Sequence, residues 1–124
     1  MLNINPEIVC DIIAKAREFH AKEGVSFSNS SYDADWSQIL ADHKDDLTYQ
    51  EVKSAIDDLE PDQQMTLVAL MYIGRGDYTV DEWDEAYKEA EEGWTNHTAD
   101  YLLSKPLVAD YLQEGLSQFG YSCD

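Results

Sequence analysis

The sequence predicts an all-α protein, a compact single-domain bundle of about six or seven short helices around one apolar central helix. Apolar residues recur three and four positions apart along most of the chain, which is the spacing of one helix face. No stretch of useful length alternates apolar and polar residues as a half-buried strand would. A chain of 124 residues suits one domain and can bury roughly two thirds of its unfolded surface, so we expect residues 1–124 to form a single helical domain.

The first two helices are separated by a polar loop. Asn5 can cap the first helix, Pro6 takes its first position, and Gly24 is expected to stop it. Its apolar face consists of Val9, Ile12, Ile13, Ala16 and Phe19. Residues 25–32 then form the polar loop. A second helix is predicted by the spacing of Trp36, Ile39, Leu40, His43 and Leu47.

The start of a third helix is predicted at Thr48 and Glu51, which have the spacing of a capping box. The capping box pairs the side chain of each residue with the backbone of the other. The expected apolar face of this helix consists of Val52, Ala55, Ile56 and Leu59.

The fourth helix is expected to be the centre of the fold. Pro61 opens it, and residues 65–73 are apolar on nearly every side, so other elements must surround it. Gly74 and Gly76 are expected to end it, because glycine tolerates the left-handed geometry of a C-terminal cap.

Three more helices follow. Thr79 and Glu82 form a second capping box, which predicts a fifth helix. Its apolar face consists of Trp83, Ala86, Tyr87, Ala90 and Trp94. A short sixth helix carries Ala99, Leu102 and Leu103, and a seventh begins after Pro106 and ends at Gly120.

The composition is strongly acidic, with 26 acidic against 8 basic residues and a net charge of −18. Binding to nucleic acid or to an anionic membrane surface requires clustered lysine and arginine, so the charge argues against both. No basic segment precedes an apolar one near the start, and the longest apolar run is far too short to span a bilayer. We therefore expect a cytoplasmic protein, in which Cys10 and Cys123 are free thiols.

No catalytic or cofactor-binding signature is present. The spacing of His20, His43 and His97 does not match a metal site, and we expect no cofactor. Gly76 and Glu82 match the second half of a calcium loop, but the preceding ligand positions hold two apolar side chains and an arginine, which cannot coordinate calcium. The activity is undecided, and these observations favour a protein that is not an enzyme.

The most distinctive feature is the stretch 81–92, in which seven of twelve residues are acidic and Lys88 alone is basic. The simplest interpretation is a solvated helix face. The alternatives are a docking surface for a basic protein or a mimic of nucleic-acid phosphates. The candidate interaction or ligand site consists of Arg75, Asp81, Glu82, Glu85 and Glu89.

Arg75 allows two interpretations. It stands at the end of the most apolar helix, where the helix dipole favours a cation, so it can act as a structural clamp paired with an acidic residue. Alternatively, it anchors a ligand.

Three stretches resemble one family: "IIAKAREFHAKE" near the start, "LVALMYIGRGDYTVDEWDEA" in the middle and "ADYLLSKPLVADYLQEGLSQFG" near the end. The family is catalogued as domain of unknown function 3775 and is found mainly in bacteria. The resemblance implies a helical domain and brings no activity, cofactor or catalytic residue.

Two classes of function remain. The first is a non-enzymatic protein-interaction or regulatory module that binds a basic protein, with a homodimer as a related alternative. The second is a small enzyme or ligand-binding domain with a site between helices, for which the candidates are Arg75 and the three histidines, His20, His43 and His97.

Overall fold

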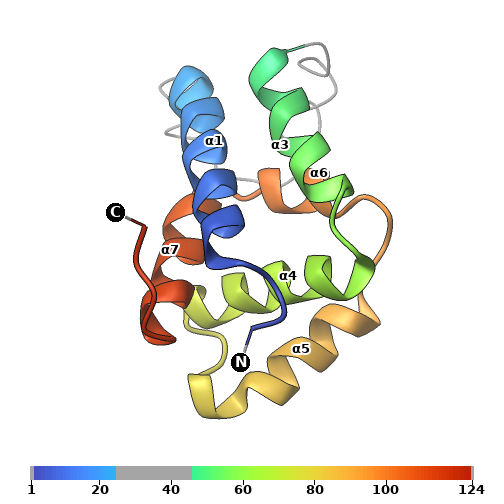
Figure 1. Cartoon of the computed structure of the whole chain (residues 1–124), viewed down its shortest axis with the longest axis vertical. Coiled ribbons are helices and arrows are strands. Elements are labelled where there is room, and N and C mark those ends of the chain that lie inside the picture. The colour runs from blue at the N-terminus through green and yellow to red at the C-terminus, as the bar shows by residue number, and fades with distance from the viewer. Residues whose placement is uncertain (1, 25–45, 124) are drawn as a thin grey trace.

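The computed structural model describes residues 2–24 and 46–123, and it is entirely helical over these ranges (Figure 1). The described part contains six α-helices, one short 3-10 helix and no strand, which confirms the predicted fold class. The helices are α1 (Pro6–Gly24), α3 (Leu47–Asp57), α4 (Pro61–Arg75), the 3-10 helix η2 (Val80–Glu82), α5 (Trp83–Glu92), α6 (Thr98–Leu103) and α7 (Val108–Gln118). The predicted loop over 25–32 and nearly all of the predicted second helix lie outside the described residues.

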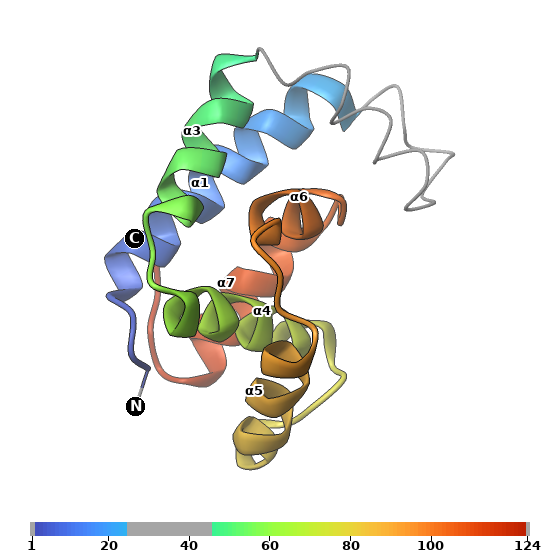
Figure 2. The same ribbon diagram turned by 90° about the vertical axis from the view of Figure 1, so that its right-hand side faces the viewer.

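The helices form two groups that share a core. α1 and α3 lie side by side and antiparallel, and they pack on α7 and α6 respectively (Figures 1 and 2). α4 packs between α7 and α5. Nearly every residue of α4 from Gln64 to Ile73 is buried, as its apolar sequence predicts. However, α1 and α3 pack mainly on each other, α7 and α6, so these contacts do not single out α4 as the one centre of the bundle.

Two glycines allow α4 and α7 to approach closely. A Cβ atom on Gly74 would lie 1.7 Å from the carbonyl oxygen of Tyr111, and one on Gly115 would lie 2.4 Å from the carbonyl oxygen of Leu70. Gly74 therefore belongs to α4 and serves helix packing, so the prediction that it ends the helix was wrong. Gly76 is the residue that ends it, with a left-handed φ of 92°.

Among the described helices, three of the predicted start signals are present. The side chain of Asn5 accepts a hydrogen bond from the backbone N–H of Glu7 (2.9 Å), and Pro61 takes the first position of α4. The N–H of Thr79 donates to Glu82 Oε1 (2.9 Å), so the second predicted capping box is present and begins η2.

The predicted capping box of Thr48 and Glu51 was wrong, because Asp46 caps α3 instead. Asp46 Oδ1 accepts hydrogen bonds from the backbone N–H groups of Thr48 (2.8 Å) and Tyr49 (3.1 Å). A carboxylate is a stronger acceptor than a hydroxyl, and one placed earlier satisfies two of the N–H groups that a helix start leaves unpaired. Thr48 is consequently buried within the first turn.

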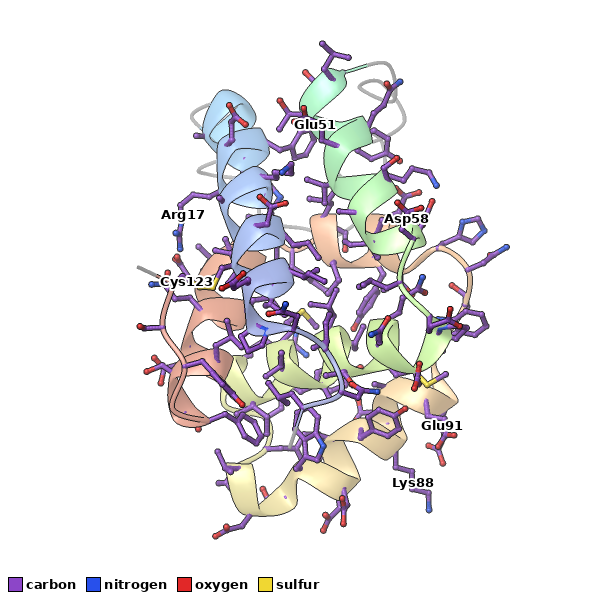
Figure 3. The ribbon with its side chains drawn as sticks, in the orientation of Figure 1. Arg17, Glu51, Asp58, Lys88, Glu91 and Cys123 are labelled. Carbon is purple, nitrogen blue, oxygen red and sulfur yellow. A yellow bond between two sulfur atoms is a disulfide. The ribbon has the colours of Figure 1, made fainter. Side chains whose placement is uncertain are left out.

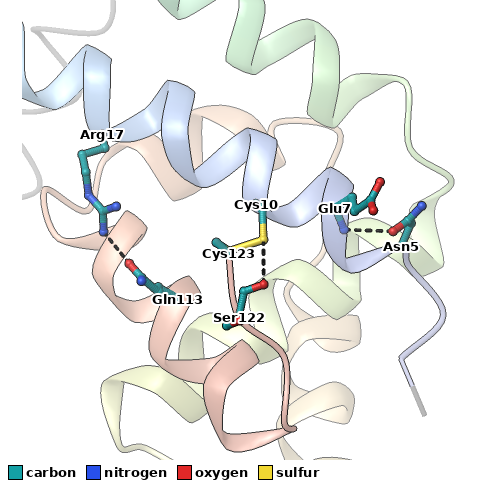
Figure 4. Close-up of a disulfide and its surroundings, with 7 residues drawn as sticks. All are labelled: Asn5, Glu7, Cys10, Arg17, Gln113, Ser122 and Cys123. Carbon is teal, nitrogen blue, oxygen red and sulfur yellow. Dashed lines mark hydrogen bonds between the residues drawn. A yellow bond between two sulfur atoms is a disulfide. The ribbon is translucent and has the colours of Figure 1, made fainter.

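The prediction of two free thiols was also wrong, because Cys10 and Cys123 form a disulfide (Figure 4). Gly120, in a left-handed conformation, turns the chain after α7 back toward α1, where the two Cα atoms lie 5.4 Å apart. The carbonyl oxygen of Ser122 lies 3.9 Å from Cys10 Sγ. The cysteines are 113 positions apart in the sequence, so no local pattern predicts that they meet.

Candidate interaction site

The acidic residues of 81–92 lie on the exposed side of α5. Ala86 and Ala90 are buried, and Trp83 and Tyr87 are partly buried against the core. Figure 3 shows Lys88 and Glu91 projecting away from α4. The seven acidic residues are all exposed, namely Asp81, Glu82, Asp84, Glu85, Glu89, Glu91 and Glu92. The helix therefore presents its apolar face to α4 and its charge to solvent.

Charge along α5 is unevenly matched to the helix dipole. Asp84 and Glu85 lie in the first turn, where the dipole favours negative charge. The last turn contains no basic residue, and there Glu89, Glu91 and Glu92 face the negative end of the dipole. Glu85, Glu89 and Glu92 also follow one another at intervals of four and three, so these like charges repel along one edge. The C-terminal end of α5 is thus an electrostatically unfavourable place that an external cation would stabilise.

The structure divides the five predicted site residues into two roles. Glu82 belongs to the capping box, and Glu89 accepts a hydrogen bond from the hydroxyl group of Tyr78. Asp81 and Glu85 are exposed, and within the described part of the chain no hydrogen bond or ion pair engages their side chains. Only these two of the four predicted acids are therefore open to a partner without loss of an internal contact.

Arg75 is paired with an acid, as the clamp interpretation predicts. Its Nε donates to Asp77 Oδ2 (2.8 Å), and the second guanidinium nitrogen lies 2.7 Å from the same oxygen. The guanidinium carbon lies 5.5 Å from the centre of the Tyr72 ring, and the Tyr72 and Tyr78 rings are 6.1 Å apart. The hydroxyl group of Tyr78 in turn donates a hydrogen bond to Glu89. The rings of Tyr72 and Tyr78 therefore lie between Arg75 and the acidic edge of α5.

A pocket of about 220 Å³ opens beside that edge, between α4, the end of α5 and α6. The connection from α5 to α6 crosses α4 (Figure 2), and Gly93, Trp94 and Thr95 of this connection line the pocket. Its walls are aromatic, apolar and hydroxyl-bearing, and consist of Val68, Tyr72, Ala90, Gly93, Trp94, Thr95, Thr98 and Tyr101.

The three aromatic walls are held by internal contacts. Trp94 Nε1 donates to Gln64 Oε1 (2.9 Å), and the buried Gln64 amide donates to the carbonyl oxygen of Ile56 (2.9 Å). Burial raises the pKa of Tyr72, and a hydrogen bond with Tyr101 together with the charge of Glu89 raises it further. Each aromatic wall therefore makes an internal contact that restrains it before a ligand binds.

Sequence analysis missed this pocket. Trp94 was predicted on the fifth helix, but α5 ends at Glu92, and Trp94 lies in the connection that follows. The aromatic residues come from positions 72, 94 and 101, on different elements, so no local spacing relates them. The one available signal was a surplus of aromatic residues near helix ends.

The described candidates for a catalytic site, His20, His97 and Arg75, lie on different elements and do not line a common hollow. His20 is buried, with Nε2 2.9 Å from the carbonyl oxygen of Leu103, and burial lowers its pKa, which favours the neutral ring. His97 is exposed at the start of α6, Arg75 ends α4, and His43 lies outside the described residues. His20 lines a hollow with Arg17 and Asp110, which neither His97 nor Arg75 lines.

Within residues 2–24 and 46–123, no three His, Cys, Asp or Glu side chains are grouped so that they could hold a metal ion. No described helix combines the length and apolar character needed to cross a bilayer.

The fold and the site define a small, acidic, all-α protein with an aromatic pocket beside a charged helix. The chain belongs to the family described as protein of unknown function (DUF3775), whose model matches residues 49–121. The match begins in α3 and includes the acidic helix and all walls of the pocket, whereas both cysteines lie outside it. No curated protein and no solved structure matches the chain.

Proposed function

We propose that the protein is a non-enzymatic interaction module that docks a basic protein segment along the exposed face of α5. The observation that supports this most directly is the last turn of α5, where three acidic residues meet the negative end of the helix dipole. The turn itself contains no basic residue, and Lys88 directly precedes it. Binding of a cationic segment replaces that repulsion with attraction. Relief of the repulsion therefore contributes favourably to the free energy of binding.

The charge of the whole molecule supports the same partner. A net charge of −18 produces a long-range field that attracts positively charged proteins and accelerates their encounter. Charge alone does not identify a partner, because each solvent-exposed ion pair contributes only about 0–1 kcal/mol to the free energy of an interaction. Specific recognition requires a desolvated anchor, and the aromatic pocket lies next to the charged edge.

The test compares two variants of equal charge for binding to a fluorescent octalysine peptide. One variant carries Asp81→Asn, Glu85→Gln and Glu92→Gln on the α5 face. Its control removes three exposed acids elsewhere, with Glu18→Gln on α1, Glu51→Gln on α3 and Glu114→Gln on α7.

We expect the α5 variant to bind the peptide at least about tenfold more weakly than the control, because three adjacent charges are lost from one surface. Equal weakening of both variants would show that only net charge matters, and the α5 docking surface would then be wrong. The same comparison at high salt measures how much of the affinity is screened.

A further inference from the structure

We infer that the pocket between α4, α5 and α6 receives a single lysine or arginine side chain of the basic partner, held against the rings of Tyr72, Trp94 and Tyr101. The inference rests on the proposed function and adds the position at which the partner is recognised. It names the anchor that charge alone does not supply.

The size of the pocket suits one side chain. Sites for drug-sized molecules occupy roughly 300–1,000 Å³. The volume here is about 220 Å³, below that range. Tyr101 forms part of the wall and remains 39% exposed, so the pocket is open to solvent on the side of α6.

The rings that line the pocket already attract cations within the molecule. The Arg75 guanidinium carbon lies 5.5 Å from the centre of the Tyr72 ring, and Lys105 Nζ lies 5.0 Å from that of Tyr101. Both distances fall within the roughly 6 Å over which a cation is attracted to an aromatic face. Neither Arg75 nor Lys105 lines the pocket itself, so the ring surfaces that face the cavity stay available.

The charged groups around the pocket favour a cation over a neutral side chain. The charge of Glu89 acts on the pocket residue Tyr72, whose pKa it raises. Glu92 directly precedes Gly93 of the pocket wall. Asp100 precedes Tyr101 and accepts a hydrogen bond from the hydroxyl of Tyr49. On the positive side, Asp77 pairs with Arg75 and Asp57 pairs with Lys53, so Lys105 over the Tyr101 ring and Lys88, four positions before Glu92, are the opposing charges among the described residues. The balance of these groups is negative.

An NMR titration of the whole protein tests the inference with two matched probes, N-acetyl-L-lysine amide and N-acetyl-L-norleucine amide. The norleucine compound offers a similar aliphatic chain without the ammonium group. We expect the lysine probe to shift the Trp94 indole N–H and the Tyr72 and Tyr101 ring signals, with a Kd about three- to tenfold lower than that of norleucine. Equal affinities, or shifts confined to other residues, would overturn the inference.

Two substitutions at Tyr101 separate ring chemistry from shape. Tyr101→Phe keeps the aromatic face and should retain the preference for lysine, whereas Tyr101→Leu removes the face and should lose it. Retention of the preference in Tyr101→Leu would also overturn the inference. Circular dichroism confirms that both variants fold, and Tyr101 suits this test because it is partly exposed.

Octalysine binding by the same variants distinguishes this inference from the proposed function. If the affinity for octalysine depends on the α5 acids but is the same for Tyr101→Leu as for wild type, the docking surface is supported and the pocket inference is overturned. If the lysine probe binds the pocket but octalysine binds the α5 variant as tightly as the control, the pocket inference is supported and the proposed docking surface is wrong.

Discussion

One glycine on α4 and one on α7 determine how closely these two helices can approach. Glycine in a helix interior costs about 1 kcal/mol relative to alanine, so Gly74 and Gly115 are retained against helix propensity. The geometry explains why, since each lies against a backbone carbonyl oxygen of the other helix.

We predict that Gly74→Ala lowers the free energy of unfolding by about 3 kcal/mol, near the upper end for overpacking. The added methyl group would lie 1.7 Å from the Tyr111 carbonyl oxygen, so α4 and α7 must separate. Gly93→Ala is the matched control, because its Cβ would lie 3.6 Å from the nearest atom and its φ is negative. Urea unfolding measures both, and equal stabilities would show that the helix crossing is looser than described.

Arg75→Ala should destabilise the protein by about 1 kcal/mol. Charge-assisted hydrogen bonds contribute about 1.5–3 kcal/mol, but this pair is partly solvated, since the Arg75 and Asp77 side chains are 32% and 41% exposed. Arg75→Lys should recover only part of the loss, because an ammonium group cannot make both contacts to Asp77 in the same geometry. Thermal melting of the three proteins checks the order, and a wild-type melting temperature for Arg75→Ala would make ligand anchoring the better interpretation.

Tyr78 gives a prediction for alkaline pH. The hydrogen bond from its hydroxyl group to Glu89 raises the pKa of Tyr78 to about 12, above the roughly 10 of an unfolded tyrosine. The unfolded chain therefore loses this proton first, so the stabilising contribution is complete below pH ~10 and disappears as pH rises toward ~12.

A phenolate absorbance titration checks this, with Tyr78→Phe identifying the transition that belongs to Tyr78. Glu89→Gln should lower the pKa of Tyr78 toward ~10, because the amide keeps an acceptor but removes the negative charge. If Tyr78 ionises at the ordinary pH in the wild-type protein, its contact with Glu89 is absent in solution.

At the scale of elements, α5 combines a favourable first turn with an unfavourable last turn. We predict that Glu92→Gln raises the free energy of unfolding by about 0.3–1 kcal/mol, because it removes a negative charge from the negative end of the helix dipole. Asp84→Asn, in the first turn, should lower it by a similar amount.

Urea unfolding at low salt measures the two changes, and both should shrink as salt screens the charges. The pair is matched, since each variant removes one acidic charge from the same helix. Stabilisation by both substitutions would show that net repulsion outweighs the dipole, and the argument for an unfavourable last turn would fail.

For the whole molecule, the disulfide closes almost the full length of the chain. Chain-entropy arguments give about 4–5 kcal/mol for a loop of this length, and removal of native disulfides typically costs about 2–5 kcal/mol. Reductant should therefore lower the melting temperature of the wild-type protein. The Cys10→Ser, Cys123→Ser double variant should melt at the reduced wild-type temperature and should not respond to reductant.

An unchanged melting temperature of the wild-type protein, with thiols shown free by alkylation, would mean that the cysteines are not paired. The result also bears on location. Stable disulfides are typical of oxidising compartments, whereas the cytoplasmic location expected from the sequence is reducing and stays a prediction.

Local features of the chain could be predicted because their causes lie within a few residues. Asn5, Pro61 and the pair of Thr79 and Glu82 mark helix starts through contacts that span at most three positions. The periodic apolar residues likewise predicted which faces of α1, α3, α5 and α6 pack on the core, since periodicity and burial share one helical repeat. The start of α3 was predicted wrongly, at Thr48 instead of Asp46. Both residues can cap a helix, and local spacing alone does not show which one does.

Contacts between distant residues were decided only by tertiary structure. The Cys10–Cys123 disulfide, the approach of Gly74 to Tyr111 and the aromatic pocket each join elements far apart in sequence, and one sequence carries no record of which distant residues meet. The acidic character of 81–92 follows from composition. Which acids remain open to a partner depends on the fold, because Tyr78 donates a hydrogen bond to Glu89, whereas within the described part of the chain no such contact engages Glu85.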